Sequence, residues 1–247
     1  MKISAWVFRL RFWVFAVLFA LGFAAPWDSV LHLDGRGPNA HLWGWSAAML
    51  AKSGAVQIGA AFDLLLGIGI ALALAAAVLR TWSAASLGPS VVHGSDMQSG
   101  AVVQSGPYRY LRNPLYLSTW LMTLALALLM PPSGAVFAIV TIGVFQLWLI
   151  LEEERFLSAR LGQPYAEYRS RVPRLLPAFR PRVPAMPLRP HWGQAFLAEI
   201  FYWGVFVSFA AVGWQYNAQL LERCILISLG VWMVVLGVMR PSNSKEA

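Results

Sequence analysis

Long apolar runs separated by short polar segments dominate this chain. A helix needs about 20 apolar residues to cross a bilayer. Six runs are of about that length, and they cover residues 6–26, 54–79, 114–130, 134–151, 194–213 and 219–239. The pattern therefore predicts an all-α protein, a multi-pass transmembrane helical bundle of about six spans.

The third and fourth runs form a distinctive pair. Only Pro131-Pro132-Ser133-Gly134 separates them, and this is a strong turn signal. We expect the chain to cross and return at once, which brings two polar segments to the same face. The first is Gly106-Pro-Tyr-Arg-Tyr-Leu-Arg-Asn-Pro-Leu-Tyr-Leu-Ser118, and the second runs from Glu152-Glu-Glu-Arg-Phe-Leu157 to Arg174.

Basic residues are distributed unequally between the two predicted faces. Sixteen of the 19 Lys and Arg lie on the face of the two polar segments and both termini, and three lie on the other face. The positive-inside rule therefore places both termini and both segments in the cytoplasm. The net charge of +8 follows from this asymmetry. Because no nucleic-acid motif accompanies it, we expect anionic membrane lipids, and no nucleic acid, as partners.

The ends of this hairpin suggest a site. Asn113 and Pro114 are a good N-cap and first helical residue, and a helix N-terminus favours an anion. The carboxylates of Glu152–Glu154, expected at the end of the returning helix, suit an ammonium group or ribose hydroxyls. There they would oppose the helix dipole, and such a local conflict is typical of functional positions. The alternative is that these three are solvated charges flanking a membrane helix.

At these residues the chain resembles the integral-membrane S-adenosylmethionine-dependent methyltransferases, which include isoprenylcysteine carboxyl methyltransferase and the phospholipid N-methyltransferases. The resemblance covers roughly residues 80–180. That family carries Gly-Pro-Tyr-x-x-x-Arg-His-Pro-x-Tyr-x-Gly, then Glu-Glu-x-x-Leu, then Tyr-x-x-Tyr and Val-Pro-Arg. The matching residues are Arg112, Pro114, Tyr116, Glu153, Glu154, Leu157, Tyr165, Tyr168, Val172, Pro173 and Arg174, with Gly162 in step with a family glycine.

The chain departs from the family in three places. Asn113 stands where the family commonly has His, and Ser118 stands where it has Gly. An amide does not titrate near neutral pH, so a proton shuttle at position 113 is in doubt. The third departure is a C-terminal extension of about seventy residues beyond the Val-Pro-Arg element.

The resemblance implies S-adenosylmethionine as the cofactor and a set of residues around it. The cofactor-binding residues are Tyr108, Arg112, Asn113, Pro114, Tyr116 and Glu153. By charge, Glu153 or Glu154 suits the ammonium group or ribose, and Arg112 suits the carboxylate. Glu154, Arg171 and Arg174 are the candidate catalytic residues. The two arginines either clamp an anionic substrate group or contact lipid headgroups. Neither Cys224 nor the four histidines show metal-ligand spacing, so no metal site is expected.

The implied function is methyl transfer to a lipophilic, membrane-resident acceptor that is a carboxylate, an amine or a hydroxyl. We expect an integral protein of a bacterial inner membrane with its site facing the cytoplasm. One alternative is an NADPH-dependent reductase of the sterol and steroid reductase type. Those enzymes generally follow Arg-His-Pro-x-Tyr with Arg-Asp and Lys-Tyr-Gly, whereas this chain has Glu-Glu-x-x-Leu. The other alternative is a lipid-binding protein without catalysis.

Three parts are expected along the chain: N-terminal transmembrane helices over 1–80, a methyltransferase-like core with the cofactor site over 81–183, and an additional transmembrane hairpin over 184–247. No oligomeric state is indicated.

The second run carries Gly59, Asp63, Gly67, Ala71 and Ala75 at four-residue steps, which predicts a close-packing stripe. An intramembrane carboxylate such as Asp63 is a functional candidate, but a hydrogen bond within the bundle is the preferred interpretation.

Overall fold

The structure is a computed structural model that describes residues 2–24, 41–87, 104–186 and 189–239, with side chains from residue 10 onward. Its described residues form helices and connecting segments and contain no strand. The principal helices are α1 (Lys2–Ala24), α4 (Ile58–Leu87), α6 (Pro114–Ala127), α7 (Pro132–Leu161), α9 (Trp192–Ala198), α10 (Ile200–Val207) and α11 (Ala218–Met239). Shorter elements are α3 (Leu42–Lys52), η1 (Gly106–Arg109), α8 (Gln163–Arg171), η2 (Ser208–Val212) and η3 (Gly213–Gln215).

The helices correspond to the six predicted apolar runs. Among the described residues, α4, α7 and α11 are long and apolar enough to cross a membrane. A fourth candidate is α9 together with the following Ile200–Gln215 segment, which are bent by 65° relative to each other. The remaining two, Leu10–Ala24 of α1 and α6, are shorter apolar helices. The predicted all-α, multi-pass membrane bundle is therefore confirmed.

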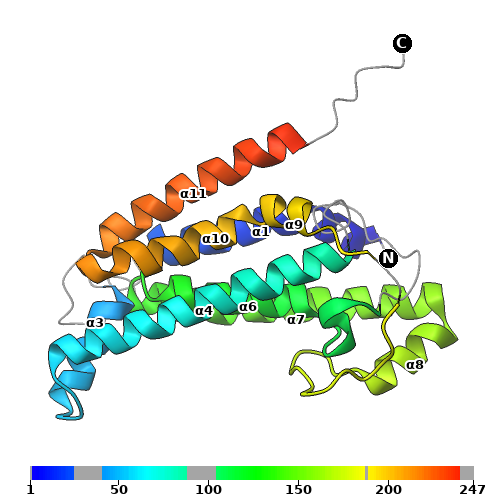
Figure 1. The fold of residues 1–247 in the computed structure, drawn as a ribbon, viewed down its shortest axis with the longest axis horizontal. Helices are drawn as coiled ribbons and strands as arrows, with labels where there is room; N and C mark the ends of the chain where they lie inside the picture. The colour runs from blue at the N-terminus through cyan, green and yellow to red at the C-terminus, as the bar shows by residue number, and fades with distance from the viewer. Residues whose placement is uncertain (1, 25–40, 88–103, 187–188, 240–247) are drawn as a thin grey trace.

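The helices run alongside one another, so the molecule has two distinct ends (Figure 1). One end holds α3, and we call it the α3 end. The other holds the N-terminus, η1, α8 and the start of α9, and we call it the motif end. Because α6 begins and α7 finishes at the motif end, the two polar segments predicted from the sequence do meet there.

Small residues of α4 allow the centre of the bundle to pack closely. Helix α4 packs against α3, α6 and α10. A Cβ atom at Gly69 would lie 3.0 Å from both Leu128 and Phe209, so this position favours glycine. Ala73 and Ala76 are completely buried beside it. The core is thus centred on α4. Small residues are common at helix contacts in membrane proteins because they let the helices approach closely.

The predicted packing stripe on α4 is wrong. Gly59, Asp63, Gly67, Ala71 and Ala75 are all exposed. The buried face lies at neighbouring positions, because lipid and protein interior are both apolar and the sequence does not reveal which face meets which. The preferred interpretation of Asp63 holds, since the Tyr216 hydroxyl donates a hydrogen bond to its carboxylate.

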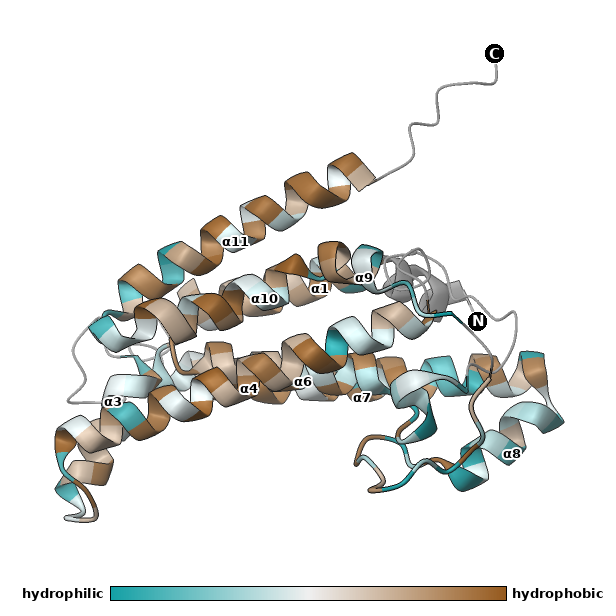
Figure 2. Ribbon diagram, in the orientation of Figure 1, coloured by the Kyte–Doolittle hydropathy of each residue, from teal (hydrophilic) through white to brown (hydrophobic). Residues whose placement is uncertain are grey.

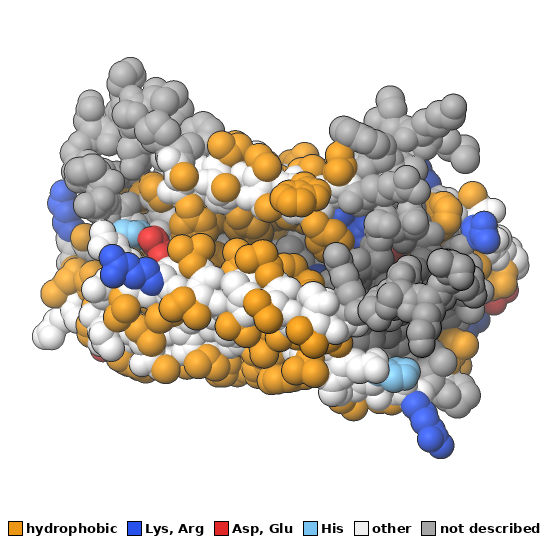
Figure 3. Space-filling model, turned by 90° about the horizontal axis from the view of Figure 1, so that it is seen from above, with side chains coloured by type: hydrophobic (Ala, Val, Ile, Leu, Met, Phe, Trp, Pro, Cys, Tyr) orange, Lys and Arg blue, Asp and Glu red, His pale blue; other side chains and the backbone are white. Residues whose placement is uncertain are grey.

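The surface has the character of a membrane protein. Hydrophobic residues follow the long helices in Figure 2, and in the face shown in Figure 3 most Lys and Arg side chains lie toward the two ends. On α7, the side chains of Val136, Val140, Val144 and Leu147 are exposed at successive turns. This exposed stripe is suited to contact with lipid.

Two helices extend further than the apolar runs. Helix α7 continues to Leu161, so Glu152–Glu154 do not lie at its C-terminus, and the argument from an opposed dipole is wrong. Glu, Arg and Leu are good helix formers, and the helix ends only at Gly162, whose φ is +58°. Helix α4 likewise continues to Leu87, which places Arg80 inside the bundle and not in a connecting loop.

Candidate functional site

The motif end is organised by a tight approach of η1 to α4. Gly106 has a φ of +53°, and any Cβ atom there would collide with the Ser86 side chain. A glycine is therefore required for η1 to lie against α4. Pro107 and Tyr108, the next two residues, are buried by this contact. The Gly-Pro-Tyr sequence thus has a structural role in holding Tyr108 inside the motif end.

The segment after α8 runs back along η1 and fixes it in place. Backbone hydrogen bonds join Arg112 N to the Pro173 carbonyl at 2.8 Å and Ala178 N to the Tyr110 carbonyl at 3.0 Å. The Tyr168 hydroxyl donates to the Tyr108 carbonyl at 2.7 Å. A small apolar cluster beneath this segment consists of Tyr165, Tyr168, Val172 and Val183. The Tyr-x-x-Tyr and Val-Pro sequences therefore act as structural anchors for the first polar segment.

A buried carboxylate lies at the centre of the motif end. Glu154 is 4% exposed and accepts two hydrogen bonds from Arg174, from Nε at 3.1 Å and from Nη2 at 2.9 Å. The Arg112 Nη1 atom lies 3.1 Å from Glu154 Oε1 and forms an ion pair with it. The hydrogen bond from Arg174 to Glu154 raises the pKa of the guanidinium above its usual value. We call Glu154, Arg112, Arg174 and Asn113 the Glu154 cluster.

Asn113 belongs to this cluster through its side chain. It is the residue before α6, and Pro114 is the first helical residue, as predicted. Its side chain makes no capping hydrogen bond, however, so the expected capping role is wrong. The amide Nδ2 instead donates to the Arg174 carbonyl at 3.1 Å and to Glu154 at 3.4 Å. The donating Nδ2 atom thus ties Asn113 to the cluster, while the side chain accepts no hydrogen bond from the first backbone N–H groups of α6.

Glu153 has a different environment from its neighbour. Its carboxylate accepts a hydrogen bond from the Tyr116 hydroxyl at 3.0 Å. Successive residues of a helix point in different directions, so Glu153 faces α6 while Glu154 faces the arginines. Arg11 of α1 contributes a positive charge near Glu153. Glu153 is therefore partly buried between helices, and the hydrogen bond that it accepts comes from a neutral group.

Three buried polar atoms in this region have no hydrogen-bond partner among the described residues. They are the Tyr108 hydroxyl, Arg112 Nε and Arg112 Nη1, the last of which contacts Glu154 as an ion pair only. Burial, followed by the nearby charge of Glu153, holds the pKa of Tyr108 well above its usual value. The phenol is therefore neutral and able to donate. An unpaired buried donor is costly and indicates a site completed by another molecule.

These residues fit S-adenosylmethionine chemically. The cofactor carries an ammonium group, a carboxylate and two ribose hydroxyls. Glu153 suits the ammonium group or the hydroxyls, and the unpaired Tyr108 and Arg112 donors suit acceptor atoms. The described residues contain no group of His, Cys, Asp and Glu that could hold a metal ion.

The two arginines predicted as catalytic are placed differently. Arg174 lies in the Glu154 cluster, whereas Arg171 is exposed at the end of α8. The structure brings together Tyr108, Arg112, Asn113, Tyr116, Glu153, Glu154 and Arg174 at the motif end. It also adds a pair that sequence reasoning missed, Arg80 and Glu199, joined at 3.1 Å. A signal for this pair was present, because Glu199 is a lone carboxylate in an apolar run.

Comparison with known proteins gives one match. A family model described as phospholipid methyltransferase matches residues 64–163. No curated protein and no solved structure matches the chain. The matched segment contains Tyr108, Tyr116, Glu153 and Glu154, whereas Arg174 and the α9–α11 region lie beyond it. Over residues 64–163 this protein is thus similar to the phospholipid methyltransferase family, in agreement with the resemblance to membrane methyltransferases seen in its sequence motifs.

Proposed function

We propose that the protein transfers a methyl group from S-adenosylmethionine to a lipophilic acceptor within the membrane. The observation that carries this proposal is the arrangement around Glu153 in the matched segment. A carboxylate bonded to one neutral hydroxyl lies near a buried, unpaired phenol. Such a set is able to bind a cationic, hydroxyl-rich cofactor without first breaking an ion pair.

In this proposal the residues divide into two roles. Glu153, Tyr116 and Tyr108 contact the cofactor, with Arg112 Nε available to a carboxylate. The Glu154 cluster positions them, because it connects the start of α6 with α7 and with the segment after α8. The bound cofactor would supply an electrophilic methyl group. The protein contributes alignment of the acceptor and exclusion of water, which accounts for much of the acceleration of a two-substrate displacement.

The acceptor is proposed only as a lipophilic molecule with a nucleophilic carboxylate, amine or hydroxyl. Exposed apolar stripes bring the protein into contact with lipid, and the matched family supports a lipid as substrate. A carboxylate is already ionised at neutral pH. An amine or a hydroxyl must lose a proton, and Asn113 does not accept one near neutral pH. Glu153, Glu154 and water remain as proton acceptors for those two classes.

The test is calorimetric titration of the purified protein in detergent with S-adenosylmethionine and, separately, with NADPH. We expect binding of the first and none of the second. Transfer of a labelled methyl group is then measured with phosphatidylethanolamine, palmitic acid and a long-chain isoprenoid alcohol as the amine, carboxylate and hydroxyl probes. Binding of NADPH alone would favour the reductase alternative. Binding of neither cofactor would favour a non-catalytic lipid-binding protein.

We further propose that the motif end faces the cytoplasm of a bacterial cell, as the positive-inside distribution indicates. Cysteines introduced at Ser53, at the α3 end, and at Ala166, on α8, provide the measurement, because both positions are exposed. In a Cys224→Ala background, an impermeant thiol reagent applied to intact cells should label the Ser53→Cys variant and spare the Ala166→Cys variant. Labelling of the Ala166→Cys variant and not of the Ser53→Cys variant would show that the motif end faces the outside.

A further inference from the structure

The C-terminal helices contribute a charged residue to the interior of the bundle. Glu199 lies at the break between α9 and α10 and is 1% exposed. It lies outside the segment that matches the methyltransferase family. A carboxylate buried to this degree is costly unless it is paired, so its partner shows what it does.

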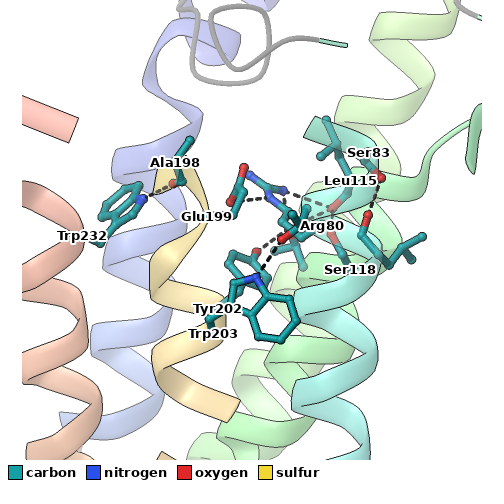
Figure 4. A network of polar contacts seen from close by, with 12 residues as sticks. Arg80, Ser83, Leu115, Ser118, Ala198, Glu199, Tyr202, Trp203 and Trp232 are labelled. Carbon is teal, nitrogen blue, oxygen red and sulfur yellow. Dashed lines mark hydrogen bonds and ion pairs between the residues drawn. The ribbon is translucent and has the colours of Figure 1, made fainter. Parts of the chain in front are cut away.

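One partner is Arg80 of α4, which connects three helices (Figure 4). Its Nε atom donates to Glu199 Oε2 at 3.1 Å. Its Nη1 atom donates to the Leu115 carbonyl at 3.3 Å and to Thr119 Oγ1 at 3.2 Å, both on α6. Tyr202 of α10 completes the network, with its hydroxyl 3.1 Å from Thr119 Oγ1 and its ring beneath the guanidinium.

The network acts on the first turn of α6, which is part of the candidate site. Leu115, whose carbonyl accepts from Arg80, directly precedes Tyr116, the residue that donates to Glu153. Arg80 and Glu199 are also among the charges that act on the Tyr108 hydroxyl. A change in the position of Arg80 therefore reaches Tyr116 through a single peptide unit and reaches Tyr108 through space.

A buried ion pair is weak support for stability, because desolvation of both charges offsets their attraction. Apolar side chains would join α4, α6 and α10 at least as well. This chain instead places an arginine and a carboxylate next to the cofactor-binding residues. The geometry points to Glu199 as a positioning residue: it holds Arg80 against the first turn of α6, so that the C-terminal helices form part of the methyl-transfer unit. This inference rests on the proposed function.

The test compares Glu199→Gln with the double variant Arg80→Met/Glu199→Leu and with Trp203→Phe as a matched control. Trp203 donates to Thr81 Oγ1 at 2.9 Å across the same α10–α4 contact, whereas the Arg80 hydrogen bonds described above go to Glu199, Leu115 and Thr119. Three quantities are measured in detergent: the melting temperature, the affinity for S-adenosylmethionine, and amide hydrogen exchange of residues 114–119 without cofactor.

We expect Glu199→Gln to weaken cofactor binding about ten- to a hundred-fold, because a small displacement of binding residues has an effect of this size. The same variant should also speed amide hydrogen exchange over residues 114–119. The double variant should regain the melting temperature of the native protein but not its affinity or its slow exchange. Trp203→Phe should lower the melting temperature while the affinity stays within about three-fold of native.

Native affinity and native exchange in Glu199→Gln would overturn the inference, as would full recovery of affinity in the double variant. If the proposed function is wrong, the native protein will not bind S-adenosylmethionine. This outcome differs from failure of the inference about Glu199, which shows only in the variants. If Glu199→Gln does not fold, the double variant carries the test, since it removes both members of the Arg80–Glu199 pair.

Discussion

The two ends of the bundle use charged residues in different ways. At the motif end the carboxylates of Glu154 and Glu199 are almost completely buried, and each contacts at least one arginine. At the α3 end His41 lies 3.0 Å from Glu222, and both side chains are partly exposed. Solvent screens the second kind of pair, whereas the first kind is costly to desolvate. Among the described residues, the buried carboxylates thus lie at the motif end, beside the candidate site.

The largest effect is expected from removing the charge at the centre of the motif end. Glu154→Gln leaves Arg112 and Arg174 without their carboxylate, so the protein should lose about 3–5 kcal/mol of stability. Thermal unfolding in detergent measures this loss. The control is Glu152→Gln on the same helix, whose partner Arg155 is exposed at 75%. That variant should change stability by less than about 1 kcal/mol. Equal effects of the two variants would contradict the contrast between buried and exposed pairs.

The adjacent carboxylate should affect binding and not folding. Glu153→Gln removes the negative charge but keeps a hydrogen-bond acceptor for Tyr116, so its melting temperature should stay close to native. Its affinity for S-adenosylmethionine should fall by about 1.5–3 kcal/mol, or roughly ten- to a hundred-fold, as measured by calorimetry. Tyr116→Phe keeps the charge and should bind more tightly than Glu153→Gln. Native affinity in Glu153→Gln would assign this glutamate a structural role alone.

Asn113 provides a test within the Glu154 cluster. Asn113→Leu removes both donated hydrogen bonds and should cost about 1–3 kcal/mol of stability, because the Arg174 carbonyl and the buried Glu154 carboxylate each lose a donor. Asn113→His restores a donor, and the family residue, and should be close to native. Stability and cofactor affinity of both variants across pH 6–8 are the measurements. If Asn113→Leu were as stable as Asn113→His, the Asn113 amide would make no contribution to the stability of the Glu154 cluster.

The smallest effect is expected at the α3 end. Glu222→Gln breaks the exposed contact with His41 and should change stability by less than about 1 kcal/mol, with no change in cofactor affinity. Added salt should reduce even this difference, since exposed pairs are screened. Thermal unfolding at low and high ionic strength is the measurement. If Glu222→Gln lost as much stability as Glu154→Gln, burial would not explain the difference between the ion pairs at the two ends.

The sequence by itself determined the elements and their order. Six apolar runs, the Pro131-Pro132 turn and Pro114 at a helix start were sufficient to predict the bundle, the hairpin and the meeting of two polar segments. The two polar segments carried the family resemblance that the match over 64–163 confirms. These features are local in sequence, and hydrophobic period and turn chemistry report them directly. The division into three parts along the chain and the roles of the site residues stay predictions.

Only the tertiary structure decided which side chains are partners. It directed Glu154 to the arginines and Glu153 to Tyr116, turned Asn113 away from its helix end, and joined Arg80 to Glu199 across 119 residues. It also placed the stripe of Gly59 and Gly67 on the exposed face of α4. In a membrane, lipid and protein interior are equally apolar, so hydrophobicity does not reveal the rotation of a helix about its axis. That rotation is set by packing and buried ion pairs between distant segments, and these exist only in the folded chain.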